Sequence, residues 1–257
     1  MLLLAPPLSA SLRDCFLPER PGNSLVGLHV LQTGHGTCRV DRWPEPRVAL
    51  AECGGNLALV GEPGALSPDD LQPHLIGFLD AAPAFDALLR ATVPTLVVWP
   101  RVVLTLPDRP RPASAVDALI RPLGPADAVH LAGLSPGAAW IAASWGGPHG
   151  LAASGYAWGA FRAGRLASVA CTFFVGERYE ELGVVTEPAE RGRGLSVACA
   201  AALCQAAQAR GRQPSWSTSP DNTPSLRVAD KLGFVHARED RLLVIGHPPP
   251  APAQPKR

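Results

Sequence analysis

The sequence from Tyr179 to Phe234 reads YEELGVVTEPAERGRGLSVACAAALCQAAQARGRQPSWSTSPDNTPSLRVADKLGF. It begins with a β-prone run, Leu182–Thr186, which ends at the breaker Glu187-Pro188. A basic glycine loop, Arg191–Ser196, follows and leads directly into an alanine-rich stretch. A helix N-terminus has unpaired N–H groups and a partial positive charge, and glycines let a ligand approach the backbone closely. The order of these segments therefore predicts a cradle for a pyrophosphate.

The segments after the loop strengthen this interpretation, because Arg-Gly clusters alone also occur in solvated turns and nucleic-acid tails. Residues 195–209 are apolar almost all round and rich in Ala and Cys, which predicts a buried helix packed closely on a sheet. A second β-prone segment, Pro214–Ser219, comes next. Asn222 then caps a short helix, Pro224 lies in its first turn, and Gly233 ends it before a new strand.

Two motifs occur in order within this stretch: Arg191-x-x-Gly194-x-Ser196, then Asn222-x-x-Ser225 followed by Lys231-Leu232-Gly233-Phe234. Together they resemble the GNAT superfamily of N-acetyltransferases. The first is similar to that superfamily's acyl-CoA loop, and the second to the signature after its fifth strand. Pro-x-Trp at 214–216 together with the Lys-Leu-Gly-Phe motif looks like a bacterial branch. The resemblance is strongest over 179–234, extends back to about residue 118 and is weak over the first hundred or so residues.

The resemblance implies an α/β (α+β) protein with the GNAT fold, in which helices flank a mixed, mostly antiparallel central sheet. The proline-dense segment Pro107–Pro112 resists helix and sheet and is the best linker candidate. We expect an N-terminal α/β domain at 1–112, a GNAT domain at 113–247 and a disordered proline-rich tail at 248–257. The N-terminal domain has strands and helices of its own and could be a degenerate GNAT-like copy, although it lacks a phosphate loop.

Alternation of residue types and the positions of breakers predict the individual elements. In the first half we expect a helix at 9–17 and strands at 36–40, 47–52 and 56–60. A helix then starts at 67–70 and leads into 71–79, a second follows around 84–91, and strands at 95–99 and 102–106 are separated by Pro100. In the second half we expect a strand at 119–123, helices from 125 and 136, a hairpin of 155–162 and 165–175, a strand at 179–186, and a final hairpin of 234–239 and 242–245.

The resemblance also implies acetyl-CoA as a co-substrate. The arginine-glycine loop is expected to surround its pyrophosphate. The backbone before Glu187 is expected to hold the pantetheine arm, in the gap that GNAT folds leave between strands four and five. The residues expected to bind the cofactor are Val185, Thr186, Arg191, Gly192, Arg193, Gly194, Leu195, Ser196, Asn222 and Ser225. For Asn222 a plain helix cap is a competing interpretation.

Acetyl transfer needs an unprotonated amine beside the thioester, and an alkyl amine has a pKa of about 10.4 in water. A base therefore helps at neutral pH. GNAT enzymes attack directly from the bound amine, which implies no acyl-enzyme. Glu180 and Glu181, on the fourth strand of the implied fold, are the candidate bases. Strand alternation lets at most one of them point into the cleft, and the competing interpretation is that both are solvated.

The general acid is where the sequence departs from the GNAT pattern. Many GNAT enzymes have a Tyr four residues before the closing Gly of the second signature, and Ala229 occupies that position here. A thiol has a pKa of only about 8.5, so the leaving group needs little help. Ser219, Tyr179 or water could assist the leaving thiol, and the sequence does not choose between them. The missing Tyr also suggests a rival function, a non-catalytic module that binds or senses acyl-CoA.

Composition narrows the class of protein further. The formal net charge of +1 over 257 residues argues against a general nucleic-acid or membrane-surface binder. The six cysteines form no CxxC pair and the seven histidines do not cluster, so we expect buried thiols and no metal site. No signal peptide or membrane span is evident, and we expect a cytoplasmic monomer or homodimer.

The sequence does not identify the acceptor beyond a small-molecule or peptide amine. The cofactor is accounted for within 179–234, so another part of the chain must shape the acceptor cleft. We expect the N-terminal half to pack against the GNAT domain, to cover or line that cleft, and to bind no nucleotide itself.

Overall fold

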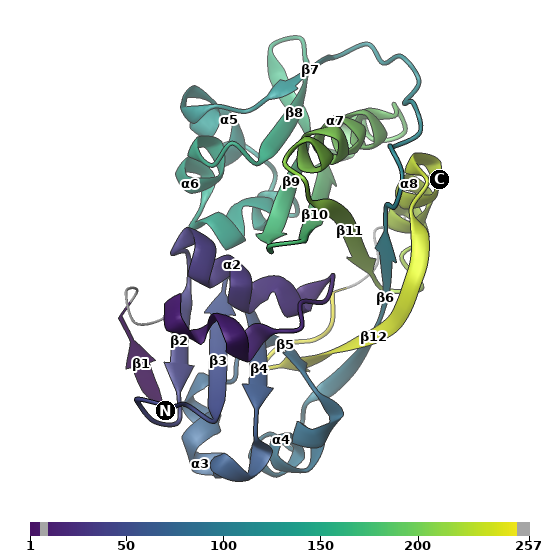
Figure 1. The fold of residues 1–257 in the computed structure, drawn as a ribbon. Helices are drawn as coiled ribbons and strands as arrows, with labels where there is room; N and C mark the ends of the chain where they lie inside the picture. Colours follow the sequence, from purple (N-terminus) through teal and green to yellow (C-terminus); the bar gives the residue numbers. More distant parts are fainter. Residues whose placement is uncertain (6–9, 251–257) are drawn as a thin grey trace.

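The computed structural model describes residues 1–5 and 10–250 and contains a 12-stranded sheet (Figure 1). Its strand order is β1-β2-β3-β4-β5-β12-β6-β11-β10-β9-β8-β7. Figure 1 shows the sheet running through two lobes, which we call the N-terminal half (residues 1–112) and the C-terminal half (residues 113–250). From one edge inward the sheet runs from β1 to β5, and from the other edge it runs from β7 to β11. The first five strands of each half therefore have the same order, counted from the edge of the sheet inward.

The strands and helices have the following bounds. The strands of the N-terminal half are β1 (Leu2–Leu4), β2 (Thr37–Val40), β3 (Val48–Cys53), β4 (Asn56–Gly61), β5 (Gly77–Ala81) and β6 (Val97–Thr105). Those of the C-terminal half are β7 (Leu119–Pro122), β8 (Ala157–Arg162), β9 (Arg165–Val175), β10 (Tyr179–Thr186), β11 (Gln213–Thr218) and β12 (Val235–Ile245). The α-helices are α2 (Val26–Thr33), α3 (Pro68–Leu71), α4 (Asp86–Thr92), α5 (Ala128–Ala132), α6 (Pro148–Ala153), α7 (Leu195–Ala209) and α8 (Thr223–Leu232). The longest 3-10 helices are η1 (Ala10–Phe16) and η7 (Ala139–Trp145).

Each half contributes its last strand to the other half. Strand β12 of the C-terminal half pairs with β5, and β6 of the N-terminal half pairs with β11. The two exchanged strands also pair with each other, antiparallel, from Val235 opposite Thr105 to Val244 opposite Val97. Figure 1 shows both strands crossing between the lobes. The middle of the sheet is therefore built from both halves.

Two predicted interruptions at these strands are wrong. The expected hairpin at 234–245 is the single strand β12, with a bulge between His236 and Arg238 in place of a turn. No glycine is available there to reverse the chain, and its polar residues form ion pairs, Arg238 with Asp240 and Arg241 with Asp86. The expected break at Pro100 also does not occur, because pairing with β12 continues on both sides of it.

The sheet has the expected mixed, mostly antiparallel character, with parallel pairs β4–β5 and β10–β11 among the described strands. The predicted hairpin of β8 and β9, the strand β10 and the helices α7 and α8 are confirmed. The turn between β8 and β9 has positive φ at Ala163 (46°) and Gly164 (74°), as a tight hairpin requires. These elements confirm the predicted fold class.

The predicted helix start at Ser67–Asp70 is confirmed, because α3 begins at Pro68 with Ser67 as its N-cap, but the predicted continuation over 71–79 is wrong. α3 ends at Leu71, a short 3-10 turn covers Gln72–His74, and Gly77–Ala81 forms β5. Pro73 lacks the N–H that a continuing helix needs, and pairing of β5 with both β4 and β12 outweighs the local helical tendency. The helix expected at 9–17 is the 3-10 helix η1, and α2 was not predicted at all.

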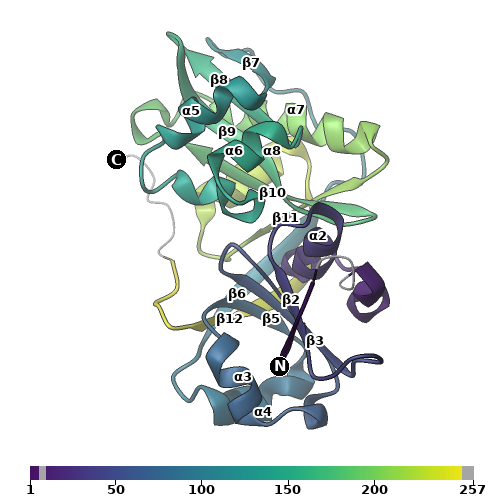
Figure 2. The ribbon, with the colours of Figure 1, turned by 90° about the vertical axis from the view of Figure 1, so that its left-hand side faces the viewer.

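Hydrophobic cores lie on both faces of the sheet in each half. In the C-terminal half α7 and α8 cover one face, and α5, α6 and η7 cover the other (Figures 1 and 2). In the N-terminal half α2 lies on one face, and α3 and α4 on the other. Cys199 and Cys204 of α7 and Cys171 of β9 are buried free thiols, as expected. The alanine and cysteine side chains let α7 pack close to the strands beneath it.

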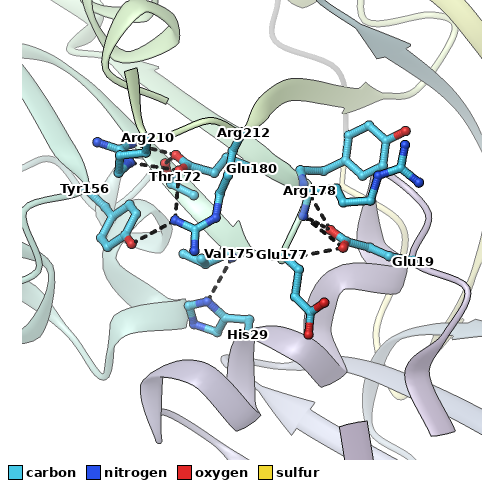
Figure 3. Close-up of polar contacts among 11 residues, drawn as sticks. Glu19, His29, Tyr156, Thr172, Val175, Glu177, Arg178, Glu180, Arg210 and Arg212 are labelled. Carbon is cyan, nitrogen blue, oxygen red and sulfur yellow. Dashed lines mark hydrogen bonds and ion pairs between the residues drawn. The ribbon is translucent and has the colours of Figure 1, made fainter. Parts of the chain in front are cut away.

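The Glu19 carboxylate of the N-terminal half binds the turn between β9 and β10. Figure 3 shows that it accepts hydrogen bonds from the backbone N–H groups of Glu177, Arg178 and Tyr179, at 2.9–3.2 Å. The buried His29 of α2 accepts from the Val175 N–H and contacts the Ser144 carbonyl at 2.8 Å. Burial lowers the pKa of His29 to about 4, so it bridges the halves as a neutral ring.

Replacing Glu19 with Ala should lower the free energy of unfolding by about 1–3 kcal/mol, because three backbone donors lose their acceptor. Chemical denaturation monitored by circular dichroism measures this loss. Asp14→Ala is the control, since this exposed carboxylate pairs with the exposed Arg13, and its loss should change stability by less than about 1 kcal/mol. If the two variants had the same free energy of unfolding, the hydrogen bonds of Glu19 to the turn between β9 and β10 would not stabilise the fold.

A fragment of residues 113–257 should not fold alone. It lacks β6, which leaves β11 and β12 without the strand between them and exposes two edges in the middle of the sheet. Circular dichroism and thermal unfolding of the fragment test this, with co-expression of residues 1–112 as the restoring control. A fragment that is monomeric and unfolds cooperatively on its own would show that the exchanged strand is dispensable.

Candidate active site

A wedge opens between the parallel strands β10 and β11. They are in register only at Tyr179–Gln213, Glu180–Pro214 and Glu181–Ser215. Beyond Glu181 the edge of β10 that faces β11 has no partner residues on that strand, whereas its other edge stays paired with β9 up to Thr186. Because unpaired strand edges present N–H and C=O groups, the wedge suits an extended ligand that carries amides.

The glycine loop lies at the wide end of this wedge. Gly192 (φ 82°) and Gly194 (φ 77°) adopt left-handed backbone conformations, and Gly194 is the N-cap of α7. A Cβ atom on Gly194 would lie 3.3 Å from Val116. Leu195 anchors the helix start in the core, while Ser196 is half-buried. The 15-residue helix α7 therefore presents its first N–H groups and dipole beside an exposed loop, as an anion site requires.

The two arginines of the loop are exposed and held near its rim. Arg193 lies 3.2 Å from the Glu190 carboxylate, which also pairs with Arg162 at 2.5 Å. Nε of Arg191 donates to the Thr186 carbonyl at 3.4 Å. Both side chains therefore lie close to the N-terminus of α7 while their guanidinium groups stay near solvent.

The other predicted cofactor residues make local contacts. The Val185 carbonyl accepts from the Ser168 hydroxyl at 2.7 Å, and Thr186 contacts the same hydroxyl with its own. Asn222 caps α8 by accepting from the Ser225 N–H, as the sequence predicts. The Trp216 indole donates to the Ser225 hydroxyl at 2.9 Å, so this indole faces α8. The structure thus places all these residues along the wedge or at its mouth.

Glu180 and Glu181 point to opposite faces of β10, and neither is solvated. Glu180 is 0% exposed and lies on the α7 face (Figure 3), where it pairs with Arg210 at 2.7 Å and Arg212 at 3.5 Å. The Thr172 hydroxyl also donates to this carboxylate, at 2.6 Å. These contacts make Glu180 the centre of a buried ion-pair network that joins β10 to the end of α7.

Glu181 is 3% exposed and lies at the apex of the wedge, on the opposite face. The Ser215 hydroxyl donates to its carboxylate at 2.5 Å. Burial raises the pKa of Glu181, while hydrogen bonds from Ser215 and Ser217 and the charge of Arg101 oppose that rise. A carboxyl group with a raised pKa, next to an open strand edge, is suited to accepting a proton.

A small pocket of about 10 Å³, room for about one water molecule, lies on the same face of the sheet, next to the Ser217 and Arg101 side chains that interact with Glu181. The two halves share its lining, which consists of Asn23, Asp80, Arg101, Val103, Ser217, Asp240, Arg241 and Leu242. Sequence reasoning did not select the charged residues of this pocket. Arg101 carried a signal, a lone charge within the apolar run VVWPRVVLT, but the strand exchange that brings it to the wedge leaves no trace in the sequence.

Ser219 lies just beyond β11 and is 3% exposed. Ser215, Ser217 and Ser219 alternate along this segment, so the same face of the strand carries all three. Ala229, on the inner face of α8, is fully buried in the core, and no hydroxyl group replaces the missing Tyr at that position. Ser219 as the residue that assists the thiol therefore stays a prediction.

The described part of the chain contains no group of three or more His, Cys, Asp or Glu side chains placed to hold a metal ion. Within the same residues, no helix combines the length and apolar character needed to span a membrane.

Comparisons with known proteins agree with this geometry. A family model described as GNAT acetyltransferase matches residues 139–242, from η7 into β12. A protein of Streptomyces virginiae, described as an uncharacterized N-acetyltransferase in the mutA 5′ region, is 38% identical over 216 residues. That match covers 82% of this chain and 90% of the relative.

Solved structures share the whole two-lobed fold. A GCN5-related N-acetyltransferase-like protein from Streptococcus suis has a TM-score of 0.69 at 17% identity, over 93% of this chain and 99% of its own. A tandem GNAT protein from the clavulanic acid biosynthesis pathway has a TM-score of 0.58 at 16% identity, over 94% and 96%. At such identities these two show the fold alone. With the family model and the Streptomyces relative, the chain belongs to the GNAT acetyltransferase family and is an N-acetyltransferase.

Proposed function

We propose that this enzyme transfers an acetyl group from acetyl-CoA directly to a primary amine. The observation that carries the proposal is the wedge between β10 and β11, which has the N-terminus of α7 at its wide end and the buried Glu181 at its apex. A thioester lying in the wedge has an amide-binding strand edge along its arm and a proton acceptor near its carbonyl group.

The cofactor occupies the wedge in this proposal. The N–H groups of Gly192 to Ser196 bind the pyrophosphate, and Arg191 and Arg193 add positive charge at the rim. The backbone of Val185 and Thr186 bonds the pantetheine arm, and Asn222 and Ser225 flank it from the start of α8. Acetyl-CoA supplies the activated acyl group when it is bound.

The N-terminal half binds no cofactor in this proposal. It has its own parallel pair, β4–β5, but the helix that follows β4 is only the four-residue α3. The Asp70 carboxylate already occupies the start of that helix, where it accepts from the Ser67 N–H at 2.8 Å. Glu62 adds a further negative charge between β4 and α3. We therefore expect one acetyl-CoA per chain, bound by the proposed GNAT domain at 113–247.

Gly194→Asp should abolish acetyl-CoA binding, because a carboxylate at the helix start opposes the phosphates and its Cβ crowds Val116. Isothermal calorimetry measures the affinity and the stoichiometry. Gly211→Asp is the matched control, since Gly211 also has positive φ (75°) but follows the opposite end of α7. Equal loss of binding in both variants would point to unfolding, and retained binding in Gly194→Asp would exclude this site.

Glu181 is the base in the proposed mechanism. It takes one proton from the acceptor ammonium, the free amine attacks the thioester carbonyl carbon, and the carbon–sulfur bond breaks as the second proton of the nitrogen passes to the departing thiolate. Ser219, or water in its place, assists the departing thiolate. Glu180 cannot share this role, because both of its carboxylate oxygens are held by arginines on the other face.

Glu181→Gln should lower kcat by about 100-fold or more while acetyl-CoA still binds. A base acts only when ionised, so the raised pKa of Glu181 places the acid limb of kcat/KM above the ordinary glutamate value of about 4.3. That limb should vanish in the variant. Thiol release followed against pH with an amine panel is the measurement.

Glu180→Gln is the neighbouring control for this experiment. It should lower the free energy of unfolding by about 3 kcal/mol, because the variant breaks a buried ion pair, and it should keep the acid limb. If Glu180→Gln loses the acid limb and Glu181→Gln keeps it, the assignment of the base is reversed. Acetyl-CoA binding without turnover on any amine would instead favour a sensing module.

A further inference from the structure

Arg101 brings a positive charge from the N-terminal half to the face of the sheet that carries Glu181. It lies on β6, next to β11, and lines the small pocket together with Ser217 of that strand. Its side chain is half-buried, and the rest of the strand, Val97–Thr105, carries no charge. A charge in such a strand costs free energy unless another group compensates it. A compensating carboxylate is therefore expected close to Arg101.

The carboxylate opposite Arg101 in the register is already paired with another arginine. Asp240 of β12 stands opposite Arg101, and it pairs with Arg238 at 2.6 Å. The Nε atom of Arg101 is buried and has no hydrogen-bond partner among the described residues. The pocket beside it has room for about one water molecule, so no larger anion can pair with Arg101 there. The charge of Arg101 is therefore left to act on another carboxylate of the protein.

Aromatic stacking holds the Arg101 side chain in place. Its guanidinium lies over the Trp99 ring, 4.3 Å from the ring centre. The Trp99 ring in turn contacts Phe78 of β5, with the two ring centres 5.6 Å apart. A planar guanidinium on an aromatic face gains cation–π attraction and stacks well. The charge is therefore fixed beside the pocket, on the same face of the sheet as Glu181.

Glu181 carries the carboxylate on which this charge acts most. Burial raises the pKa of Glu181, while the Ser215 and Ser217 hydroxyls and the charge of Arg101 oppose that rise. Burial also lowers the pKa of Arg101 to about 10, and Glu181 opposes this more than any other carboxylate does. Each ion thus stabilises the charged form of the other. The two residues form an electrostatic pair across β11, one from each half of the chain.

The other charged groups around this pair have weaker effects on it or face away. Asp240 and Asp221 also act on Arg101, each less strongly than Glu181 does. Glu180 faces the other side of β10, where arginines hold its carboxylate. The charged side chains that complete the surroundings of the pocket are Asp80, Arg238 and Arg241. Arg101 is therefore the cation whose loss should change Glu181 most.

We propose, building on the acetyl transfer inferred above, that Arg101 is a positioning residue of this reaction, which holds the Glu181 carboxylate in the charged form that accepts the amine proton. A buried carboxylate without a cation nearby stays protonated close to neutral pH and cannot act as a base there. Arg101 supplies charge and no proton, because a guanidinium does not dissociate at neutral pH. After acetyl transfer the same charge favours the loss of the proton from Glu181 to water, which restores the base.

The pH dependence of kcat/KM distinguishes this role from a purely structural one. Arg101→Met removes the charge and keeps an apolar side chain of similar reach. The acid limb should move to higher pH by about one unit, the low end of the effect of a nearby opposite charge on a carboxyl group. Below the limb kcat/KM should fall about tenfold, and on the plateau above it kcat/KM should stay within about twofold. Thiol release with the best amine of the panel is measured for every variant, so that the titration of the amine is common to all.

Two further variants serve as controls. Arg101→Lys keeps a positive charge without the planar fork and should retain at least about half of the effect on the limb. Arg241→Met loses the same charge at the same pocket, but this arginine pairs with Asp86, so the limb should stay where it is. Isothermal calorimetry with acetyl-CoA shows that each variant is folded and binds the co-substrate. NMR of protein with isotope-labelled glutamate carboxyl groups follows Glu181 without turnover, and its signal is the one that Glu181→Gln lacks.

The outcomes separate this proposal from the acetyl transfer on which it rests. A limb and a Glu181 signal that move to higher pH in Arg101→Met, but not in Arg241→Met, support the role of Arg101. An unmoved limb, an equal fall of kcat/KM at every pH, or the same shift in Arg241→Met overturns it and leaves the acetyl transfer standing. No turnover with any amine defeats the acetyl transfer, and an unmoved Glu181 signal then overturns the action of Arg101 on Glu181 as well.

Discussion

The antiparallel pairing of β6 with β12 at the middle of the sheet is the constraint on which the rest of the structure depends. Because each of these strands comes from one half and pairs into the other, neither half closes its sheet alone. The exchange also places Arg101 of the N-terminal half and Asp240 of the C-terminal half opposite each other, next to the wedge of β10 and β11. The charged residues beside the wedge are therefore brought together by the exchange, whereas the glycine loop and α7 belong to the C-terminal half alone.

Local signals in the sequence were sufficient for the cofactor side. The ends of α7, the Asn222 cap and the Gly233 stop could all be predicted, because backbone conformation and capping are decided by a few neighbouring residues. The glycine loop was predictable for the same reason, since only glycine tolerates a left-handed backbone without strain. The alternation of Glu180 and Glu181 followed from strand geometry, but their burial did not, because it depends on Arg210 and Ser215 from distant segments.

The errors occurred where tertiary pairing decides the outcome. Residues 234–245 contain a polar stretch that predicted a turn, yet ion pairs to Asp86 and within β12 keep it extended. Residues 77–79 were predicted as the end of a helix, and pairing with β4 and β12 makes them the start of β5. Pro100 predicted an interruption of the strand, but the pairing of β6 with β12 continues on both sides of this residue. In each case the deciding partner lies far away in the chain, so no window of sequence contains the information.

The two halves share a strand plan but differ at one point that determines their roles. After β10 comes a glycine loop and a 15-residue helix with an open N-terminus, and after β4 comes a four-residue helix capped by its own Asp70. A phosphate can therefore approach only the first. In the N-terminal half β5 and β6 each carry a charged residue on the face beside the wedge, the buried Asp80 and the half-buried Arg101. Buried charges that lack full partners destabilise a fold. Packing alone would favour apolar residues at the junction, and the raised pKa of Asp80, about 6, reflects the cost of burying its charge there.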